Sequence, residues 1–66
     1  MKLKVNGQEI EIPRPLSLTE LIERLHLRLE GIAVALNTEI VPRSELAGRL
    51  IQANDQIEIV HPVGGG

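Results

Sequence analysis

The stretch Lys2-Leu3-Lys4-Val5-Asn6-Gly7-Gln8-Glu9-Ile10-Glu11-Ile12 decides the fold. It contains two runs in which polar and apolar residues alternate, and this period of two is typical of half-buried strands. Asn6-Gly7 separates the runs and favours a tight β-hairpin turn. The apolar face of this hairpin would carry Leu3, Val5, Ile10 and Ile12. The other face would carry Lys2, Lys4, Glu9 and Glu11, whose opposite charges could pair across the strands.

An amphipathic helix is predicted after the hairpin. Pro13-Arg14-Pro15 turns the chain out of the sheet. Ser17 and Glu20 then have the spacing of a capping box, in which each side chain accepts a hydrogen bond from the other residue's backbone N–H. Apolar residues recur at helical spacing at Leu18, Leu21, Ile22 and Leu25. We expect the helix to end near Leu27.

Three short strands are predicted in the second half of the chain: residues 33–37, 40–41 and 56–60. Residues 43–47 predict one turn of helix capped by Ser44. The element order favours an α+β fold, in which the helix lies across one face of a mixed sheet. The first and last strands would be adjacent and parallel in this sheet.

The chain carries three glycines, Gly64, Gly65 and Gly66, directly after the last predicted strand. Three such glycines arise by chance at about 0.03%. Glycine loses the most conformational freedom when it is ordered, so this segment is a poor choice for stabilising a fold. It suits a slim backbone that enters a narrow site on another protein. We therefore expect one domain, 1–66, with a flexible C-terminal tail, 62–66, and a reactive carboxylate on Gly66; a frayed end or a linker is the alternative.

Composition excludes several other functions. The chain has no cysteine, which excludes disulfides and thiolate metal sites and favours the cytoplasm. No apolar stretch approaches the roughly 20 residues of a membrane span. The net charge of −2, scattered basic residues and lack of aromatic residues argue against nucleic-acid binding. His26 and His61 lie far apart with no cysteine or serine elbow, so neither a self-contained catalytic site nor a metal site is expected.

Other carrier chemistries fit the sequence less well. A biotinyl or lipoyl carrier needs a lysine on an exposed turn, whereas Lys2 and Lys4 lie in the first predicted strand. Ser17 stands at a helix start, as the serine of a phosphopantetheine carrier does. Those carriers resemble helical bundles, and this chain is rich in strands.

The second half of the chain carries a family resemblance. Residues 33–45, AVALNTEIVPRSE, resemble the strand-turn-strand and the V-P-R of the ThiS family, the sulfur carriers of thiamine biosynthesis. Residues 54–60, NDQIEIV, resemble the last strand of that family, and Gly65-Gly66 resembles its functional end. The resemblance covers the whole chain and implies a ubiquitin-like β-grasp fold.

The resemblance implies a carrier that is not itself an enzyme. A ThiF-like adenylyltransferase would use ATP and magnesium to activate the Gly66 carboxylate, with Gly64 and Gly65 threading the tail into the partner site. Activation is needed because a carboxylate is anionic at neutral pH and is a poor acyl electrophile. A persulfide donor would then produce a thiocarboxylate, which supplies sulfur to a ThiG-like thiazole synthase. No cofactor bound by this chain is implied.

Three alternatives stay open at this point. A MoaD-type carrier of molybdopterin synthesis uses the same kind of terminus. A ubiquitin-like modifier would form isopeptide bonds through Gly66. A passive β-grasp interaction domain would not need a free terminus.

A few other residues carry secondary predictions. His26 is expected near the helix end, where its charged form would favour the helix dipole, and His61 is expected as an exposed residue at the end of the last strand. Arg43 is either a docking residue or a solvated turn arginine, and Leu46 is either a partner contact or a core residue. Asn37 is expected to make turn hydrogen bonds. Ala33 and Ala35 would share a flat face that is suited to docking or is simply a small-residue strand.

Overall fold

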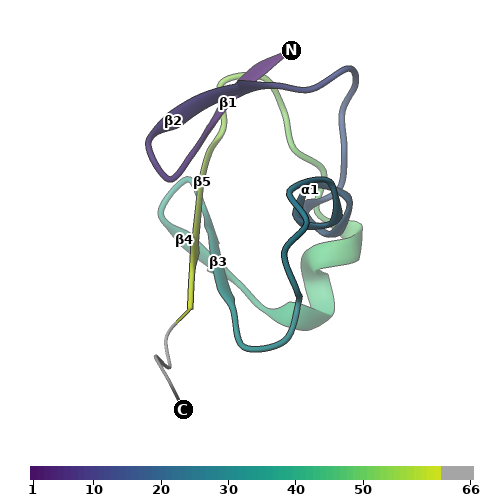
Figure 1. Cartoon of the computed structure of the whole chain (residues 1–66), viewed down its shortest axis with the longest axis vertical. Helices are drawn as coiled ribbons and strands as arrows, with labels where there is room; N and C mark the ends of the chain where they lie inside the picture. Colours follow the sequence, from purple (N-terminus) through teal and green to yellow (C-terminus); the bar gives the residue numbers. More distant parts are fainter. Residues whose placement is uncertain (62–66) are drawn as a thin grey trace.

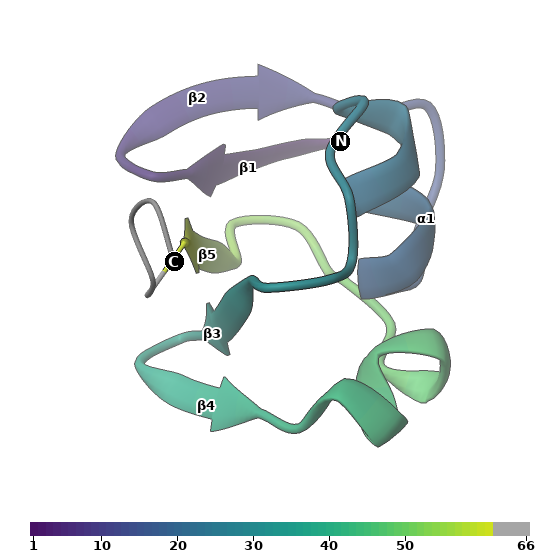
Figure 2. The ribbon, with the colours of Figure 1, turned by 60° about the horizontal axis from the view of Figure 1, so that its bottom comes forward.

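The structure is a computed structural model that describes residues 1–61 (Figure 1). Its elements are β1 (Lys2–Val5), β2 (Gln8–Glu11), α1 (Leu18–Arg24), β3 (Ala33–Leu36), β4 (Glu39–Val41), the 3-10 helix η1 (Arg43–Gly48) and β5 (Gln56–Val60). Within residues 1–61 the strands form one five-stranded sheet in the order β2-β1-β5-β3-β4, which can be followed in Figure 2. The β1–β5 pair is parallel, as predicted, and the other pairs are antiparallel.

The first hairpin forms around Asn6-Gly7 as predicted, in a register that places Leu3 opposite Ile10. Asn6 and Gly7 both have positive φ, 52° and 82°, which is the backbone of a type I′ turn. Lys2 lies opposite Glu11 in this register, and Lys4 opposite Glu9. Within the described part of the chain, neither of these pairs forms an ion pair within 4.0 Å.

The start of α1 is the predicted capping box. The Ser17 hydroxyl accepts from the Glu20 N–H at 3.1 Å, and the Glu20 carboxylate accepts from the Ser17 N–H at 2.9 Å. One face of the helix is buried through Leu18, Leu21 and Ile22. The local sequence therefore sets both where the helix begins and which side faces the core.

The end of α1 differs from the prediction, because the helix ends at Arg24 and not near Leu27. His26 adopts a left-handed φ of 60° and reverses the chain. Its N–H donates to the Glu23 carbonyl at 3.0 Å, and the Leu27 N–H donates to the Ile22 carbonyl at 3.1 Å. These two bonds form a Schellman motif, which satisfies the last carbonyls and stops the helix.

The second half of the chain forms a hairpin followed by η1. The β3–β4 turn has positive φ at Asn37, 51°, and at Thr38, 72°. The predicted cap of the following helix is wrong: η1 begins at Arg43, Pro42 occupies the capping position, and no side chain caps it. Ser44 therefore lies inside η1, after the N-cap position, so its hydroxyl cannot act as the N-cap.

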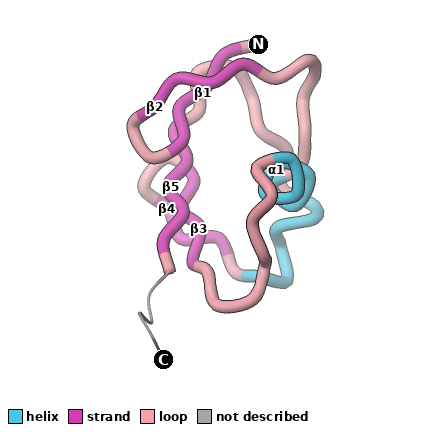
Figure 3. The backbone as a smooth tube through the Cα atoms, viewed as in Figure 1, coloured by secondary structure: helices cyan, strands magenta, loops and turns pink. Residues whose placement is uncertain are grey.

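The core lies between the sheet and the two helical segments. Figure 3 shows α1 and η1 on the same side of the sheet. The buried apolar residues are Leu3, Val5, Ile12, Leu16, Leu18, Leu21, Ile22, Val34, Leu36, Val41, Leu46, Ile51, Ile57 and Ile59. Leu46 is thus a core residue, and Ile10 and Leu25 are only partly buried. Because both helical segments cover one face, the opposite face of the sheet is left open; this face is called the outer face below.

Candidate functional site

The predicted site residues Gly64, Gly65 and Gly66, and the whole predicted tail 62–66, lie outside the described residues. The described chain ends at His61, which is exposed and directly follows β5. The part of the site that the structure describes is therefore the carboxyl end of the central strand β5, which is called the base of the tail below. Val60 at this end pairs with Ala33 of β3.

An apolar patch, consisting of Ala33, Ala35, Ile40 and Val60, lies on the outer face beside this end of β5. Direct strand neighbours point to the same side of a sheet, and the register pairs Ala33 with Val60 and Ala35 with Ile40. Ile40 is 68% exposed and Val60 53% exposed, whereas both alanines are half-buried. The alternation predicted for β3 is confirmed, since its two alanines face away from the core.

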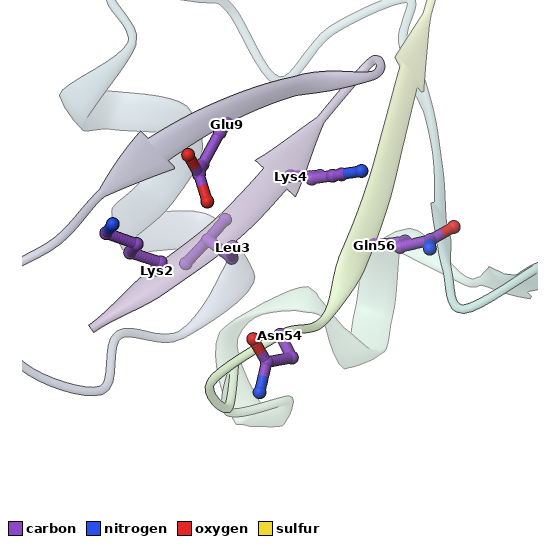
Figure 4. Close-up of a pocket in the computed structure, with 6 residues that line it drawn as sticks. All are labelled: Lys2, Leu3, Lys4, Glu9, Asn54 and Gln56. Atoms are coloured by element: carbon purple, nitrogen blue, oxygen red, sulfur yellow. The ribbon is translucent and has the colours of Figure 1, made fainter.

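The β1–β2 half of the outer face is charged. It contains a shallow hollow of about 190 Å³, lined by Lys2, Leu3, Lys4, Glu9, Asn54 and Gln56 (Figure 4). Figure 4 shows the Lys4 side chain extending toward β5. The polar groups of this hollow are two ammonium groups, one carboxylate and two amides, which do not include the histidine, cysteine or serine of a common nucleophile–base pair. The outer face is thus apolar along β3 and β4 and charged along β1 and β2, and the exposed Glu58 of β5, opposite Ala35, lies at the boundary.

Two asparagine side chains fasten β5 at its two ends. At the start, Asn37 Oδ1 accepts from the Gln56 N–H at 3.0 Å, and its Nδ2 donates to Asp55 Oδ1 at 3.0 Å. At the end, Asn6 Oδ1 accepts from the Ile59 N–H at 2.8 Å, and its Nδ2 donates to the Ile59 carbonyl at 3.2 Å. The hydrogen bonds predicted for Asn37 were those of its own turn, whereas its side chain bonds residues 18 and 19 positions away, at the start of β5. The bonds of the Asn6 side chain were not predicted, although its place in an Asn-Gly turn singled this residue out.

Within residues 1–61 the ionisable side chains do not assemble into a catalytic set. His26 lies just beyond the end of α1 and His61 follows β5, and Arg43 forms an exposed ion pair with Glu30 at 3.7 Å. Among the described residues, the pKa of Glu20 is lowered because its carboxylate accepts the Ser17 N–H, with a further contribution from the Arg14 guanidinium. Residues 1–61 include no cluster of three or more His, Cys, Asp or Glu side chains that could hold a metal ion. No helix in this part of the chain is long and apolar enough to cross a membrane.

Comparison with known proteins decides the family. The model of the ThiS family matches residues 3–66. The chain belongs to the ThiS family. It is 35% identical over 66 residues to the sulfur carrier protein ThiS of Escherichia coli, and the alignment covers all of both chains. The crystal structure of the thiamine biosynthesis protein ThiS from Geobacter metallireducens, 30% identical, superposes with a TM-score of 0.89 over the whole of both chains. The resemblance and the ubiquitin-like β-grasp fold predicted from the sequence are thereby confirmed.

A further relative places a ThiS-like segment within a larger protein. The chain is 36% identical over 66 residues to a thiazole synthase of Paramagnetospirillum magneticum. The alignment covers all of this chain but only 20% of that protein. A ThiS-like segment is therefore part of a polypeptide that is named thiazole synthase.

Proposed function

We propose that this chain is a sulfur carrier of thiamine biosynthesis and that the carboxyl group of Gly66 holds the sulfur. The observation that carries this proposal is the full-length similarity to the sulfur carrier ThiS of Escherichia coli, whose chain it matches from end to end. The absence of cysteine is consistent with it, because no side chain of this sequence could store sulfur as a persulfide.

The proposed chemistry is carried out by partners, and the chain is their protein substrate. An adenylyltransferase with ATP and magnesium joins the Gly66 carboxylate to AMP and releases pyrophosphate. The terminal sulfur of a persulfide donor then attacks the acyl carbon, and AMP leaves. A thiol cleaves the resulting acyl disulfide, which leaves a thiocarboxylate on Gly66 and a disulfide on the donor side. In this scheme the chain contributes no catalytic residue and binds no cofactor, and Gly64 and Gly65 let the backbone enter the partner site.

The apolar patch is the proposed docking surface for these partners. The five residues 62–66 span at most about 18 Å when fully extended. An enzyme that acts on Gly66 must therefore bring its active site close to the end of β5. Ile40 and Val60 are exposed apolar side chains on the outer face near this end, and burying them would favour association.

Thiazole synthase is the proposed recipient of the sulfur. The thiazole synthase of Paramagnetospirillum magneticum supports this partner, since a segment of it is similar to the whole of this chain. Carrier and recipient act on the same sulfur atom, so their presence in one polypeptide fits direct transfer. We place this reaction in the cytoplasm, in agreement with a chain that has no cysteine.

Mass spectrometry of the reaction products tests the proposal. The chain is incubated with the adenylyltransferase, ATP, magnesium and a persulfide donor, and fragmentation locates any replacement of oxygen by sulfur. Sulfur on Gly66 that passes to thiazole synthase is the expected result, and a variant ending at Gly64 serves as the control. Lack of adenylation of the wild-type chain would contradict the proposal, and transfer of Gly66 to lysines of other proteins would point to a modifier instead.

A further inference from the structure

We infer that Asn6 is a positioning residue, whose side chain holds the carboxyl end of β5 and so fixes where the tail leaves the domain. Its effect on partners rests on the proposed function. The structural part of the inference stands on the hydrogen bonds of the described residues alone.

Ile59 needs a partner on the β1 side because the β1 backbone ends too early. β1 pairs with β5 through Val5 opposite Ile57, and the Asn6 N–H donates to the Ile57 carbonyl at 2.8 Å. The chain then turns back at Gly7, whose φ is 82°. Two residues further along β5, the N–H and the carbonyl of Ile59 lie on the same side as the Ile57 carbonyl, where the β1 backbone no longer runs.

The Asn6 side chain takes the place of the missing backbone. Its amide offers an acceptor oxygen and a donor NH₂ group that can face the same way, as the C=O and N–H of a single residue in a strand do. The acceptor takes the Ile59 N–H at 2.8 Å and the donor reaches the Ile59 carbonyl at 3.2 Å. Asparagine also tolerates the φ of 52° that the turn requires. Asparagine therefore meets two demands at this position. It adopts the positive φ of the turn, and its side chain makes the two hydrogen bonds to Ile59, which together are called the clasp below.

This clasp acts at the base of the tail. Without it, Ile59 and Val60 would be held only from the β3 side, by their pairs with Val34 and Ala33. Fraying of this end would displace both Val60, a member of the apolar patch, and the start of the tail. A partner would then meet Gly66 in many positions, and the fraction in a reactive geometry would fall.

Asn37 provides a matched control within the same chain. It also lies in a turn with positive φ, 51°, and its Oδ1 also accepts a backbone N–H of β5. That N–H belongs to Gln56, at the opposite end of the strand. The substitutions Asn6→Gly and Asn37→Gly both keep a residue that accepts positive φ. Each removes the side-chain hydrogen bonds that hold one end of β5. They therefore disturb the fold in similar ways but at different distances from the tail.

The experiment measures amide hydrogen exchange and adenylation on both variants, at a temperature at which circular dichroism shows them folded. In Asn6→Gly we expect exchange at the Ile59 N–H to rise about tenfold or more relative to wild type, and in Asn37→Gly we expect the rise at Gln56 instead. For adenylation of Gly66 we expect kcat/KM to fall about tenfold in Asn6→Gly and less than about twofold in Asn37→Gly. Asn6→Asp keeps the acceptor and loses the donor, so its values should lie between those of wild type and Asn6→Gly.

Each result has a distinct meaning. Equal losses of kcat/KM in Asn6→Gly and Asn37→Gly would show that Asn6 acts only on stability, which overturns the inference. Unchanged exchange at Ile59 in Asn6→Gly would overturn it as well. If the wild-type chain is not adenylated at all, the proposed function fails, while the exchange measurement still decides whether Asn6 holds β5.

Discussion

Replacing Ile40 by threonine should weaken partner binding without weakening the fold. Fully burying an isoleucine side chain contributes roughly 1.5–3 kcal/mol, and Ile40 is still 68% exposed. About 1–2 kcal/mol is therefore available when a partner covers it, which corresponds to about a 5–30-fold change in Kd. Threonine keeps the branched Cβ that suits a strand, so the free energy of unfolding should change by less than about 0.5 kcal/mol.

Leu50→Thr is the matched control for this substitution. Leu50 is 60% exposed and lies in an apolar hollow with Met1 and Pro15, ahead of the start of β5 and away from the tail. Titration calorimetry would compare wild type, Ile40→Thr and Leu50→Thr, each against the adenylyltransferase and against thiazole synthase. We expect a weaker Kd for Ile40→Thr with both partners and an unchanged Kd for Leu50→Thr.

Two results would refute this reasoning. Wild-type affinity of Ile40→Thr for both partners would mean that the apolar patch is not the docking surface. An equal loss in Leu50→Thr would mean that partners read exposed apolar area anywhere on the domain. Thermal denaturation of all three chains checks that folding is not the cause.

The remaining predictions concern the fold. Thr38 is a branched residue with a φ of 72°, so Thr38→Gly should relieve more strain than it adds in unfolded-chain entropy and raise the Tm by several degrees; a lower Tm would contradict this. Leu21 is fully buried, so Leu21→Ala should cost about 2–5 kcal/mol and leave much of the chain unfolded by circular dichroism at 25 °C, whereas a native spectrum with an unchanged denaturant midpoint would show that the site collapses without cost. The folded state lowers the pKa of Glu20 from its ordinary value of 4.5, so its contribution to stability is present above that pH and is lost as the pH falls through the lowered pKa. Glu20→Gln should therefore flatten the loss of Tm below about pH 4.5, and superimposable pH profiles would argue against this role.

The local signals in the sequence predicted most of the fold. Asn6-Gly7 predicted the first hairpin, and the Ser17–Glu20 capping box predicted the start of the helix, because both depend on residues close in the chain. The end of the helix was missed because Leu25 continues the apolar period. His26 also adopts a left-handed conformation, which a glycine or an asparagine at this position would have indicated.

The site was predictable only in part. The outward face of Ala33 and Ala35 was predicted from alternation and is confirmed, whereas Gly64, Gly65 and Gly66, predicted from composition and position, lie outside the described residues. Grouping Ile40 and Val60 with them requires the strand register, which single-strand patterns do not give. The Asn6 clasp joins residues 53 positions apart, and no local pattern reports such a distance.

The position of β5 means that the domain can fold only when this strand is present. Of the described strands β5 is the last to be synthesised, yet it lies in the middle of the sheet and joins the β1–β2 hairpin to the β3–β4 hairpin. Two-stranded hairpins are at best marginally stable on their own, so a nascent chain cannot close its core until β5 has been translated. A fragment that ends before Gln56 would consequently lack the central strand and would not form a folded domain that competes for partners. The strand that leads into the tail is thus also the strand without which the core cannot close.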